Sequence, residues 1–408
     1  MTQLNIYTTE FFDYLDKASR ILWENKRYID AAEMIMIGTK YAKGSVCDTL
    51  LSNARMCYFH GNDIRNAVKC LEKQEELNIS NGWELQRDKC NYLRYLNRYD
   101  EAYNIALNLP NNSTKKLALS WFLHKEEKIK EAFNSVEESR ENVYWWGERT
   151  ELKLPLWNKE YSENIVIAGE SGSGDEIIFA RWIPEIKKYC KNLYYYTNSS
   201  LRDVFIRNYD LKPYNNEKEN CVFIPIMSLP YLLEVDDPGP TSYISCNQSK
   251  LDNYNLRFPK TKKRIGLCFH GEKTHFESNL RTLPHFELIN HLKDLGELIN
   301  LQKDYDEIYP NLSYYPFDSW EDTFALIDTC DLIVTCDTSI AHAASCLGKT
   351  VIVLLHAAAY FTWNHNVDVG KTKWYKNAWC IRQTEPCKWE GSMIKCKELA
   401  IELLKENL

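Results

Sequence analysis

The sequence of 408 residues has no long hydrophobic run, although 44% of its residues are hydrophobic. A membrane-spanning helix needs about 20 consecutive apolar residues, and no segment approaches that length. The first residues, Met1-Thr-Gln-Leu-Asn-Ile6, also lack the basic and apolar leader of an exported protein. We therefore expect a cytoplasmic protein without membrane insertion.

Paired cysteines are also missing. The 14 cysteines are spread singly through the chain, and no two have the CxxC spacing. Without that spacing or a secretory context, we expect reduced and mostly buried thiols rather than a disulfide framework. No His/Cys cluster has the spacing of a zinc site, so we expect no obligatory metal ion and no cofactor.

An excess of basic charge is absent as well, since the formal net charge is −7. This argues against a general nucleic-acid binder, whose footprint is basic, but leaves open one local basic groove. The length exceeds one ordinary hydrophobic core, so two or three domains are expected.

A signature recurs four times in residues 1–140. The copies are Asn25-Lys-Arg-Tyr28-Ile-Asp-Ala31, Gly61-Asn-Asp-Ile64-Arg-Asn-Ala67, Asn97-Arg-Tyr99-Asp-Glu-Ala102 and Glu127-Lys-Ile129-Lys-Glu-Ala132, with alanines separated by 36, 35 and 30 residues. Such a period, with apolar residues at helical spacing, predicts an array of helical repeats. The signature resembles the tetratricopeptide repeat (TPR), in which the aromatic residue or Ile packs between two helices and the Ala allows their close approach.

The pattern changes after Trp145-Trp146 and Leu154-Pro-Leu-Trp157. Strand-like segments then alternate with helical ones, as in parallel α/β domains; they cover 164–168, 193–197, 221–226, 264–269, 296–301, 332–335 and 351–355. We place an interdomain break at the basic run 258–264, interpreted either as a solvated linker or as a rim that attracts an anionic acceptor. The predicted domains are 1–150, helical, and then 151–260 and 261–408, both α/β.

The segment Asp337-Thr-Ser-Ile-Ala-His342 lies between two apolar strands. A helix that opens at Thr338 and Ser339 leaves backbone N–H groups unpaired in its first turn, beside two hydroxyls and a histidine. These groups form a ready site for a diphosphate.

A glycine-rich loop follows the strand at 164–168, with the sequence Gly169-Glu-Ser-Gly-Ser-Gly174-Asp175-Glu176. It lacks the Lys and Ser/Thr of a phosphate loop, and its glycines do not keep the dinucleotide-binding order. The glycines still allow another group to come close to the backbone, and Asp175 places a carboxylate at the start of a helix. Asp175 is therefore interpreted either as a general base or as a helix N-cap.

Cations follow the strand at 264–269 in His270-Gly-Glu-Lys273-Thr-His275, and Arg281-Thr-Leu-Pro284 comes next. Ligands in parallel sheets lie beyond the carboxyl ends of the strands, so at least one of Lys273, His275 and Arg281 is expected to touch an anionic ligand. Asp304-Tyr-Asp306 matches the Asp-x-Asp pattern of metal-dependent sugar transferases, but no third ligand is in view, and we interpret it as a charged loop.

Together these segments resemble the tetratricopeptide-repeat glycosyltransferases, relatives of the heptosyltransferases. The motifs that carry the resemblance are Leu154-Pro-Leu-Trp157, the loop from Gly169 to Arg181, Met227-Ser-Leu-Pro230, Arg264-Ile-Gly-Leu267, His275, Arg281-Thr-Leu-Pro284, Leu301-Gln302-Lys303, the segment from Asp337 to Lys349, Trp363 and Trp374-Tyr375. The resemblance implies a GT-B architecture, in which two Rossmann-like domains face each other. The C-terminal one holds a nucleotide-sugar and the N-terminal one presents the acceptor.

The resemblance also implies roles. Asp175 becomes the candidate base, with Glu170, Gly174 and Glu176 on the acceptor side. Arg281 would neutralise the leaving diphosphate, which Thr338, Ser339 and the following helix would cradle. Lys273, His275, Gln302, Asp337 and His342 complete the expected donor side. Glu277 and Ser278 depart from the family pattern, where Asn and Asp are usual, and His270-Gly271 replaces a commoner small-residue pair, so the donor sugar stays open.

The implied reaction is a single in-line displacement with inversion at the sugar, independent of metal. The acceptor hydroxyl could belong to a protein or peptide bound by the helical repeats, to a modified DNA base, or to a glycan. The alternative is a non-catalytic repeat scaffold that binds a nucleotide-sugar.

Overall fold

The computed structural model describes residues 2–78, 82–110, 112–140, 152–197, 200–215, 220–275, 277–304, 308–363 and 368–406. Trp145-Trp146 and Asp306, used in the sequence predictions, lie outside these ranges. The chain forms two compact units. Unit 1 contains residues 1–119 with the short segments 356–358 and 385–387, and unit 2 contains the remainder.

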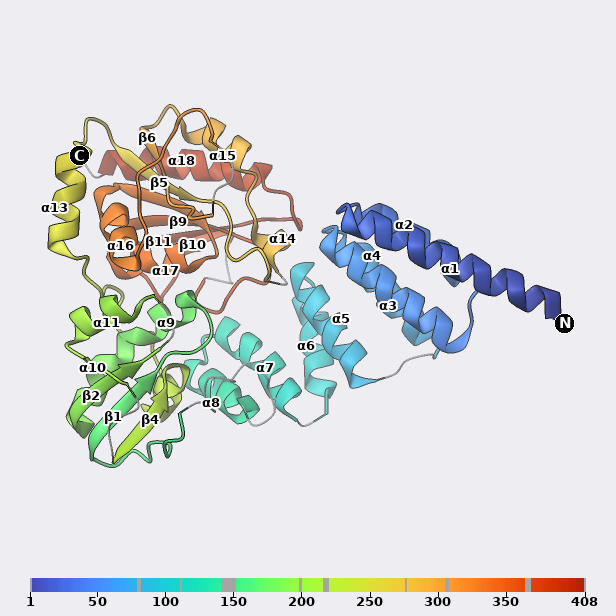
Figure 1. Ribbon diagram of the computed structural model, residues 1–408, viewed down its shortest axis with the longest axis horizontal. Helices are drawn as coiled ribbons and strands as arrows, with labels where there is room; N and C mark the ends of the chain where they lie inside the picture. Colours follow the sequence, from blue (N-terminus) through green and yellow to red (C-terminus); the bar gives the residue numbers. More distant parts are fainter. Residues whose placement is uncertain are drawn as a thin grey trace. The chain divides into compact units, whose positions relative to one another are not determined.

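The N-terminal region is helical, and from the first helix to the sixth each helix packs against the next in the chain (Figure 1). The helices are α1 (Thr2–Glu24), α2 (Tyr28–Thr39), α3 (Gly44–His60), α4 (Ile64–Glu76), α5 (Trp83–Tyr95), α6 (Tyr99–Asn108), α7 (Ser113–Lys125) and α8 (Ile129–Ser139).

The recurring signature has the same conformation in all four copies. Two residues before α2, α4, α6 and α8 begin, the backbone is left-handed, with φ of 58° at Lys26, 64° at Asn62, 60° at Asn97 and 62° at Glu127. The alanine on the fourth residue of each of these helices is fully buried (Ala31, Ala67, Ala102 and Ala132). The signature is therefore structural: it makes the turn between two helices and lets the second approach its neighbours closely.

The last helix of the array, α8, belongs to unit 2, whereas the sequence places it in a helical domain of residues 1–150. The two units divide between Leu119 and Ser120, within α7. Ile129 and Phe133 of α8 are buried in the same core as the first sheet's helices, and α8 packs on α12 (Leu229–Leu232). The signature predicts a helix, but the apolar face of that helix determines which domain it joins.

The first sheet is parallel and has the order β3-β2-β1-β4. Its strands are β1 (Ser162–Ala168), β2 (Cys190–Tyr196), β3 (Lys212–Pro213) and β4 (Cys221–Pro225). The connections hold α9 (Ser173–Phe179), η3 (Ala180–Trp182), α10 (Ile183–Ile186), η4 (Lys187–Tyr189), α11 (Arg202–Tyr209) and η5 (Ile226–Ser228), followed by α12. Strands β2 and β3 lie in succession on one side of β1, and β4 pairs with β1 on the other side.

The second sheet has the order β10-β11-β9-β8-β5-β6-β7, and all its pairings are parallel except that of β10 with β11. Its strands are β5 (Arg264–Cys268), β6 (Glu297–Asn300), β7 (Leu312–Ser313), β8 (Leu332–Cys336), β9 (Thr350–Leu355), β10 (Val369–Lys371) and β11 (Ala378–Arg382). The helices are α14 (Ser278–Arg281), α15 (His285–Leu292), α16 (Trp320–Thr329), α17 (Ser339–Cys346) and α18 (Glu390–Glu406).

Both faces of the second sheet are buried. In β9, Val351, Val353 and Leu355 belong to one core and the alternating Ile352 and Leu354 to another, which also contains residues of α15 and α18. This explains why the central strands appear as continuous apolar runs in the sequence.

The basic run 258–264, at which the sequence predicts an interdomain break, is anchored to the second sheet domain. α13 (Gln248–Arg257), which precedes this run, packs against α16 of the second sheet, and Lys250 forms an ion pair of 2.7 Å with Asp322. The chain therefore passes to the second sheet before α13. The basic run is held by acids of the second sheet domain: Lys260 lies 2.7 Å from Asp331, and the buried Arg264 lies 2.8 Å from Glu297.

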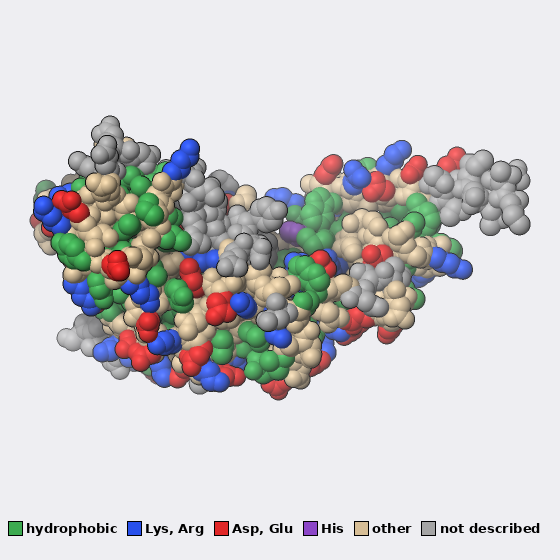
Figure 2. Space-filling view, turned by 90° about the horizontal axis from the view of Figure 1, so that it is seen from below, with side chains coloured by type: hydrophobic (Ala, Val, Ile, Leu, Met, Phe, Trp, Pro, Cys, Tyr) green, Lys and Arg blue, Asp and Glu red, His purple; other side chains and the backbone are tan. Residues whose placement is uncertain are grey.

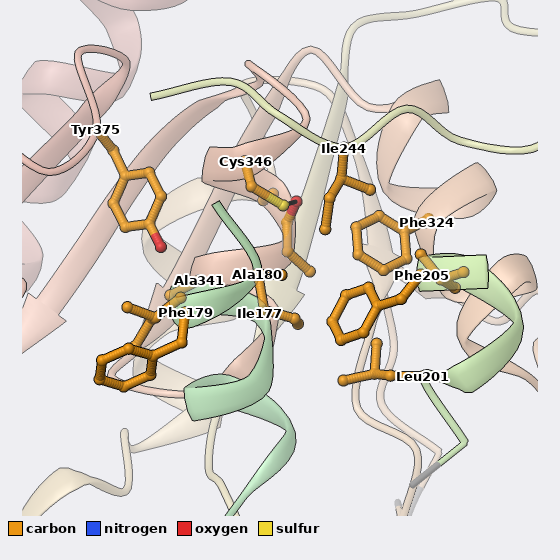
Figure 3. Close-up of a cluster of buried hydrophobic side chains, with 14 of the residues drawn as sticks. Ile177, Phe179, Ala180, Leu201, Phe205, Ile244, Phe324, Ala341, Cys346 and Tyr375 are labelled. Atoms are coloured by element: carbon orange, nitrogen blue, oxygen red, sulfur yellow. Dashed lines mark hydrogen bonds between the residues drawn. The ribbon is translucent and has the colours of Figure 1, made fainter. Parts of the chain in front are cut away.

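The two sheet domains share a continuous apolar core (Figure 3). Ile177 and Phe179 of α9 and Phe205 of α11 come from the first domain, and Phe324 of α16 and Ala341 of α17 come from the second. Burial of these side chains holds α9 against α17. This contact brings the start of α9 close to the start of α17.

Substitution of Gly266 by alanine should lower the free energy of unfolding by about 1–3 kcal/mol, because the interior of β5 has no room for a methyl group. A Cβ at this position would lie 2.6 Å from Leu301 Cδ1 and 2.7 Å from Ile333 Cδ1. Urea denaturation of the full chain measures the loss. Gly391→Ala is the matched control: it meets nothing within 4 Å on the exposed start of α18 and should be neutral or stabilising. Equal stability of the two variants would contradict the packing of β5.

His124 of α7 is buried in an aromatic cluster, where it stacks on Phe361 at 4.3 Å between ring centres. Among the described residues, neither ring nitrogen of His124 has a hydrogen-bond partner. Burial lowers the pKa of His124 to about 3, because the charged imidazolium would lose its hydration.

This burial predicts a pH dependence of stability. The unfolded chain takes up a proton on His124 below pH ~6.5 and the folded chain does not, so stability is present above that pH and is lost as the pH falls. His124→Phe should reduce the slope of the unfolding free energy by up to about 1.4 kcal/mol per pH unit between pH 6 and 4. Urea titrations at several pH values measure the slope. His291→Phe on α15 is the control, and an equal effect of both variants would contradict the assignment.

The surface and the cysteines agree with the compositional expectations. All 14 cysteines are free, and most are buried. On the face drawn in Figure 2, basic and acidic side chains are interspersed. Within the described ranges, every helix is too short or too polar to cross a lipid bilayer.

Candidate functional site

Each sheet has one topological switch point, where successive strands are added on opposite sides of a central strand. In the first sheet it lies between β1 and β4, and in the second between β5 and β8. Loops that leave the carboxyl ends of such strands diverge and leave room for a ligand. The loop after β1 contains Asp175, and the turn after β8 contains Asp337, Thr338 and Ser339. The predicted acid loop and the predicted anion turn therefore lie at the two switch points.

The glycine loop after β1 is compact. A Cβ on Gly169 would lie 2.8 Å from the Glu176 carboxylate, so a larger residue would displace the side chain that closes the loop. Ser171 has a left-handed backbone with φ of 65°. A Cβ on Gly174 would lie 3.6 Å from Ser339 Cα and 3.4 Å from the His342 ring. The sequence predicts that the backbone of this loop lies close to another group. In the structure that group is the start of α17, which lies beside Gly174.

Asp175 is not the N-cap of α9, as one sequence interpretation had it. The N-cap is Gly172, and Asp175 is the third residue of the helix. One carboxylate oxygen, Oδ2, accepts hydrogen bonds from the Ser171 hydroxyl at 2.8 Å and from the Gly172 N–H at 3.2 Å. The other, Oδ1, accepts from the Tyr360 hydroxyl at 2.6 Å.

Burial raises the pKa of Asp175 above its usual value, while these three hydrogen bonds act in the opposite direction and the charge of Asp337 adds to the rise. A half-buried carboxylate with a raised pKa is a better proton acceptor than a solvated one near neutral pH. The geometry thus allows Asp175 to act as a general base.

The turn after β8 opens α17 without a side-chain cap. Thr338 is the N-cap, but its hydroxyl makes no cap bond; it lies 3.2 Å from the Thr335 hydroxyl. Ser339, the first residue of the helix, is half-buried beside Gly174. The first turn therefore keeps backbone donors that an anion can bind.

Arg281 lies at the same switch point, as the last residue of α14 after β5. Its Nη1 donates to the backbone oxygen of Asp337 at 3.4 Å, and a Cβ on Gly271 would lie 3.3 Å from its guanidinium. Its Nε atom is buried and has no hydrogen-bond partner among the residues that the structure describes. A guanidinium with an unused donor, beside the start of α17, is suited to a phosphate group.

Residues 360–363 join the two switch points. The Tyr360 N–H donates to Asp337 Oδ2 at 3.1 Å, and the Trp363 indole donates to Asp337 Oδ1 at 2.7 Å. The Tyr360 hydroxyl bonds Asp175. Sequence analysis named Trp363 only as an aromatic position and missed Tyr360, because 185 residues separate Tyr360 from Asp175 and no motif connects them.

His342 lies behind the turn. Its ring stacks on Trp363 at 4.7 Å, and Nδ1 lies 3.1 Å from the Tyr375 hydroxyl. Burial, followed by the nearby Arg181, lowers the pKa of His342 to about 3. His342 is therefore neutral at working pH and packs under the anion turn.

Arg181 explains part of the contact between the two sheet domains. It is buried, and its guanidinium carbon lies 4.8 Å from the ring centre of Tyr375 and 4.9 Å from that of Trp374. It donates to the backbone oxygens of Ile178 at 2.9 Å and Trp374 at 3.3 Å. Cation–π contacts and backbone acceptors thus hold the cation at the domain contact.

The remaining donor-side residues lie on the loops after β5 and β6. Gln302 is buried, and its oxygen accepts from the backbone N–H groups of Phe269 and His270 at 3.1 Å each, while its nitrogen donates to Asp304 at 2.7 Å. Lys273 lies 3.6 Å from Asp304. Gln302 therefore ties the two loops together.

His275 is exposed on the loop after β5, and its Nδ1 accepts from the Glu277 N–H at 3.2 Å. Partial loss of hydration, together with the Arg281 charge, lowers the pKa of His275 to about 4. The ring is neutral near pH 7 and available as a hydrogen-bond partner rather than as a cation.

The two glutamates expected on the acceptor side point inward. Glu170 is 4% exposed and accepts from Arg140 at 2.7 Å and from the Met227 N–H at 3.1 Å. Glu176 is 3% exposed and accepts from the Tyr195 hydroxyl at 2.6 Å. Both carboxylates hold the first sheet domain together, and Asp175 is the acid of this loop that reaches the second domain.

Among the described residues, no group of three or more His, Cys, Asp and Glu side chains is arranged to hold a metal ion. Asp304 of the Asp-x-Asp segment bonds Gln302 and lies near Lys273.

No protein-family model and no curated protein matches the sequence. Among solved structures, a glycosyl transferase family 9 protein from Veillonella parvula DSM 2008 is 11% identical, with a TM-score of 0.41 over 62% of this chain and 98% of that chain. E. coli ADP-heptose lps heptosyltransferase II is 12% identical, with a TM-score of 0.46 over 60% and 100%. The iron-containing dodecameric glycosyltransferase TibC from enterotoxigenic E. coli H10407 is 14% identical, with a TM-score of 0.38 over 54% and 63%. TM-scores below 0.5 do not establish a shared activity.

Proposed function

We propose that the chain is a glycosyltransferase of GT-B architecture, which moves a sugar from a nucleoside-diphosphate sugar to an acceptor hydroxyl with inversion. The proposal rests on the hydrogen bonds that connect the two switch points. Asp175 and the Asp337–Ser339 turn, which belong to different sheets, are connected through Tyr360. A proton acceptor thus lies beside an anion site, as a sugar transfer from a diphosphate requires.

In the proposed reaction, Asp175 takes the proton from the acceptor hydroxyl. The acceptor oxygen forms the new bond to the anomeric carbon as the bond from that carbon to the diphosphate oxygen breaks. The nucleoside diphosphate leaves with the electron pair, and Arg281 and the backbone donors of α17 stabilise its charge. The proposed reaction requires no metal ion.

The acceptor is proposed to be a protein or peptide that the TPR-like helices bind. Stacked helix pairs form an extended surface suited to such a partner. If the acceptor is instead a modified DNA base, the affinity for the acceptor should fall steeply with salt concentration, because the protein would contact DNA phosphates. A flat salt dependence would oppose the DNA alternative.

Donor binding is tested by calorimetry with UDP, GDP and ADP on the full chain. We expect one of the three diphosphates to bind clearly more tightly than its own monophosphate, since the proposed anion site holds the diphosphate. No binding of any diphosphate would contradict the donor site. Binding without turnover of any nucleotide-sugar would instead favour the non-catalytic scaffold.

A further inference from the structure

Tyr360 connects the candidate base to the candidate donor turn through two different groups. Its hydroxyl lies 2.6 Å from Asp175 Oδ1, and its backbone N–H lies 3.1 Å from Asp337 Oδ2. The Trp363 indole occupies the other Asp337 oxygen at 2.7 Å. Asp337 therefore fixes the backbone of the segment that presents the Tyr360 hydroxyl.

We infer that Tyr360 is a positioning residue, which holds the Asp175 carboxylate in its working orientation and ties that orientation to the donor turn. The inference rests on the proposed function for its catalytic meaning. The hydrogen bond itself, and its effect on the Asp175 carboxylate, are independent of any donor.

The groups that face Asp175 come from three elements. Its own loop supplies the Ser171 hydroxyl and the Gly172 N–H, and the segment 360–363 supplies the Tyr360 hydroxyl. The turn after β8 supplies the like charge of Asp337. The neutral ring of His342 packs beside Gly174, and the adjacent Glu176 points away toward Tyr195.

Tyr360 has the properties of a fixed donor. Burial and the neighbouring Asp175 charge raise its pKa well above the ordinary value, so the hydroxyl keeps its proton throughout the working range. Among the described residues of the second sheet domain, Tyr360 is the one whose side chain donates a hydrogen bond to Asp175. Loss of this donor should leave the carboxylate less stabilised in its charged form.

The test is a titration of the Asp175 carboxyl carbon by NMR, in the full chain labelled with ¹³C-aspartate and assigned by the signal lost in Asp175→Asn. Tyr360→Phe should raise the pKa of Asp175 by about 1–2 units, since a hydrogen bond to a charged group is lost. Tyr315→Phe is the matched control, because Tyr315 donates to the Glu297 carboxylate at 2.5 Å on the second sheet and should leave Asp175 unchanged.

Fluorotyrosine at position 360 gives a second arm that retains the ring and the hydroxyl. Fluorine makes the phenol a stronger donor, so the pKa of Asp175 should fall rather than rise. Opposite shifts in the two variants support the inference. An Asp175 pKa that is the same in wild type, Tyr360→Phe and the fluorotyrosine protein would overturn it.

The pH dependence of kcat/KM tests whether the Tyr360 hydrogen bond affects the reaction through Asp175, because its acidic limb reports the pKa of the base. Transfer requires ionised Asp175, so the limb should move to higher pH in Tyr360→Phe by the same amount as the NMR pKa. An NMR shift in a protein that turns over no nucleotide-sugar would leave the positioning role standing and reject the proposed function. Active enzyme with an unmoved limb and an unmoved NMR pKa would reject the positioning role alone.

Discussion

Asp175→Asn should lower the rate of sugar transfer at saturating donor by about 10²–10⁴-fold, the usual contribution of a positioned general base. Asparagine keeps the shape of the side chain. Its one carbonyl oxygen can still accept from the Gly172 N–H while its NH2 donates to the Tyr360 hydroxyl oxygen, so the loop should persist. It cannot take a proton from the acceptor hydroxyl. Initial rates at saturating donor and acceptor measure the effect, and donor binding by calorimetry should change little.

The matched control is Asp322→Asn. Asp322 is also the third residue of its helix, and its carboxylate accepts from the Ser319 N–H at 3.2 Å and the Ser319 hydroxyl at 2.6 Å. It shares the capping geometry of Asp175 but lies at the start of α16. If both variants lose activity equally, the effect comes from helix capping, and the base assignment is wrong.

Arg281→Ala should weaken nucleoside-diphosphate binding by about 10–100-fold, because charge-assisted hydrogen bonds to phosphate are lost. The buried Nε without a partner and the backbone contact to Asp337 place this guanidinium at the anion turn. Calorimetry with the preferred diphosphate measures the change. Arg281→Lys should recover part of the affinity, because lysine keeps the positive charge but cannot form the bidentate hydrogen bonds of a guanidinium.

Arg257→Ala controls for the loss of one positive charge, since Arg257 is exposed at the end of α13. It should leave diphosphate affinity unchanged. Equal affinities of wild type and Arg281→Ala would remove Arg281 from the donor site.

The central strands could be predicted from the sequence because both faces of each sheet are buried, which makes every residue of β8 and β9 apolar or small. The edge strands β3, β7 and β10 could not, whereas the longer edge strand β4 was predicted at 221–226. β3 and β7 contain two residues each, and β10 pairs only with β11, so their patterns are too short to separate from loop. The recurring signature predicts α8, but the packing of α8 on α12 has no signal in the local sequence.

For the candidate site, the two turns were predictable because each follows a strand and opens a helix. Their connection was not, since Tyr360 has no local signal and reaches Asp175 only in the folded chain. The side-chain contacts of Glu170 and Glu176 could not be predicted either. Both residues flank Asp175 in sequence, yet burial and their hydrogen bonds to Arg140 and Tyr195 direct them into the first domain.

Mass spectrometry of reaction mixtures decides whether the chain transfers a sugar from a nucleotide with Asp175 as the base. The mixtures cover a panel of UDP-, GDP- and ADP-sugars with candidate acceptors, and wild type is run beside Asp175→Asn. The wild type should release one nucleoside diphosphate together with a product heavier by one sugar residue, and the variant should give about 10²–10⁴-fold less of both. Equal product from the two proteins, or no turnover of any donor by the wild type, would contradict it.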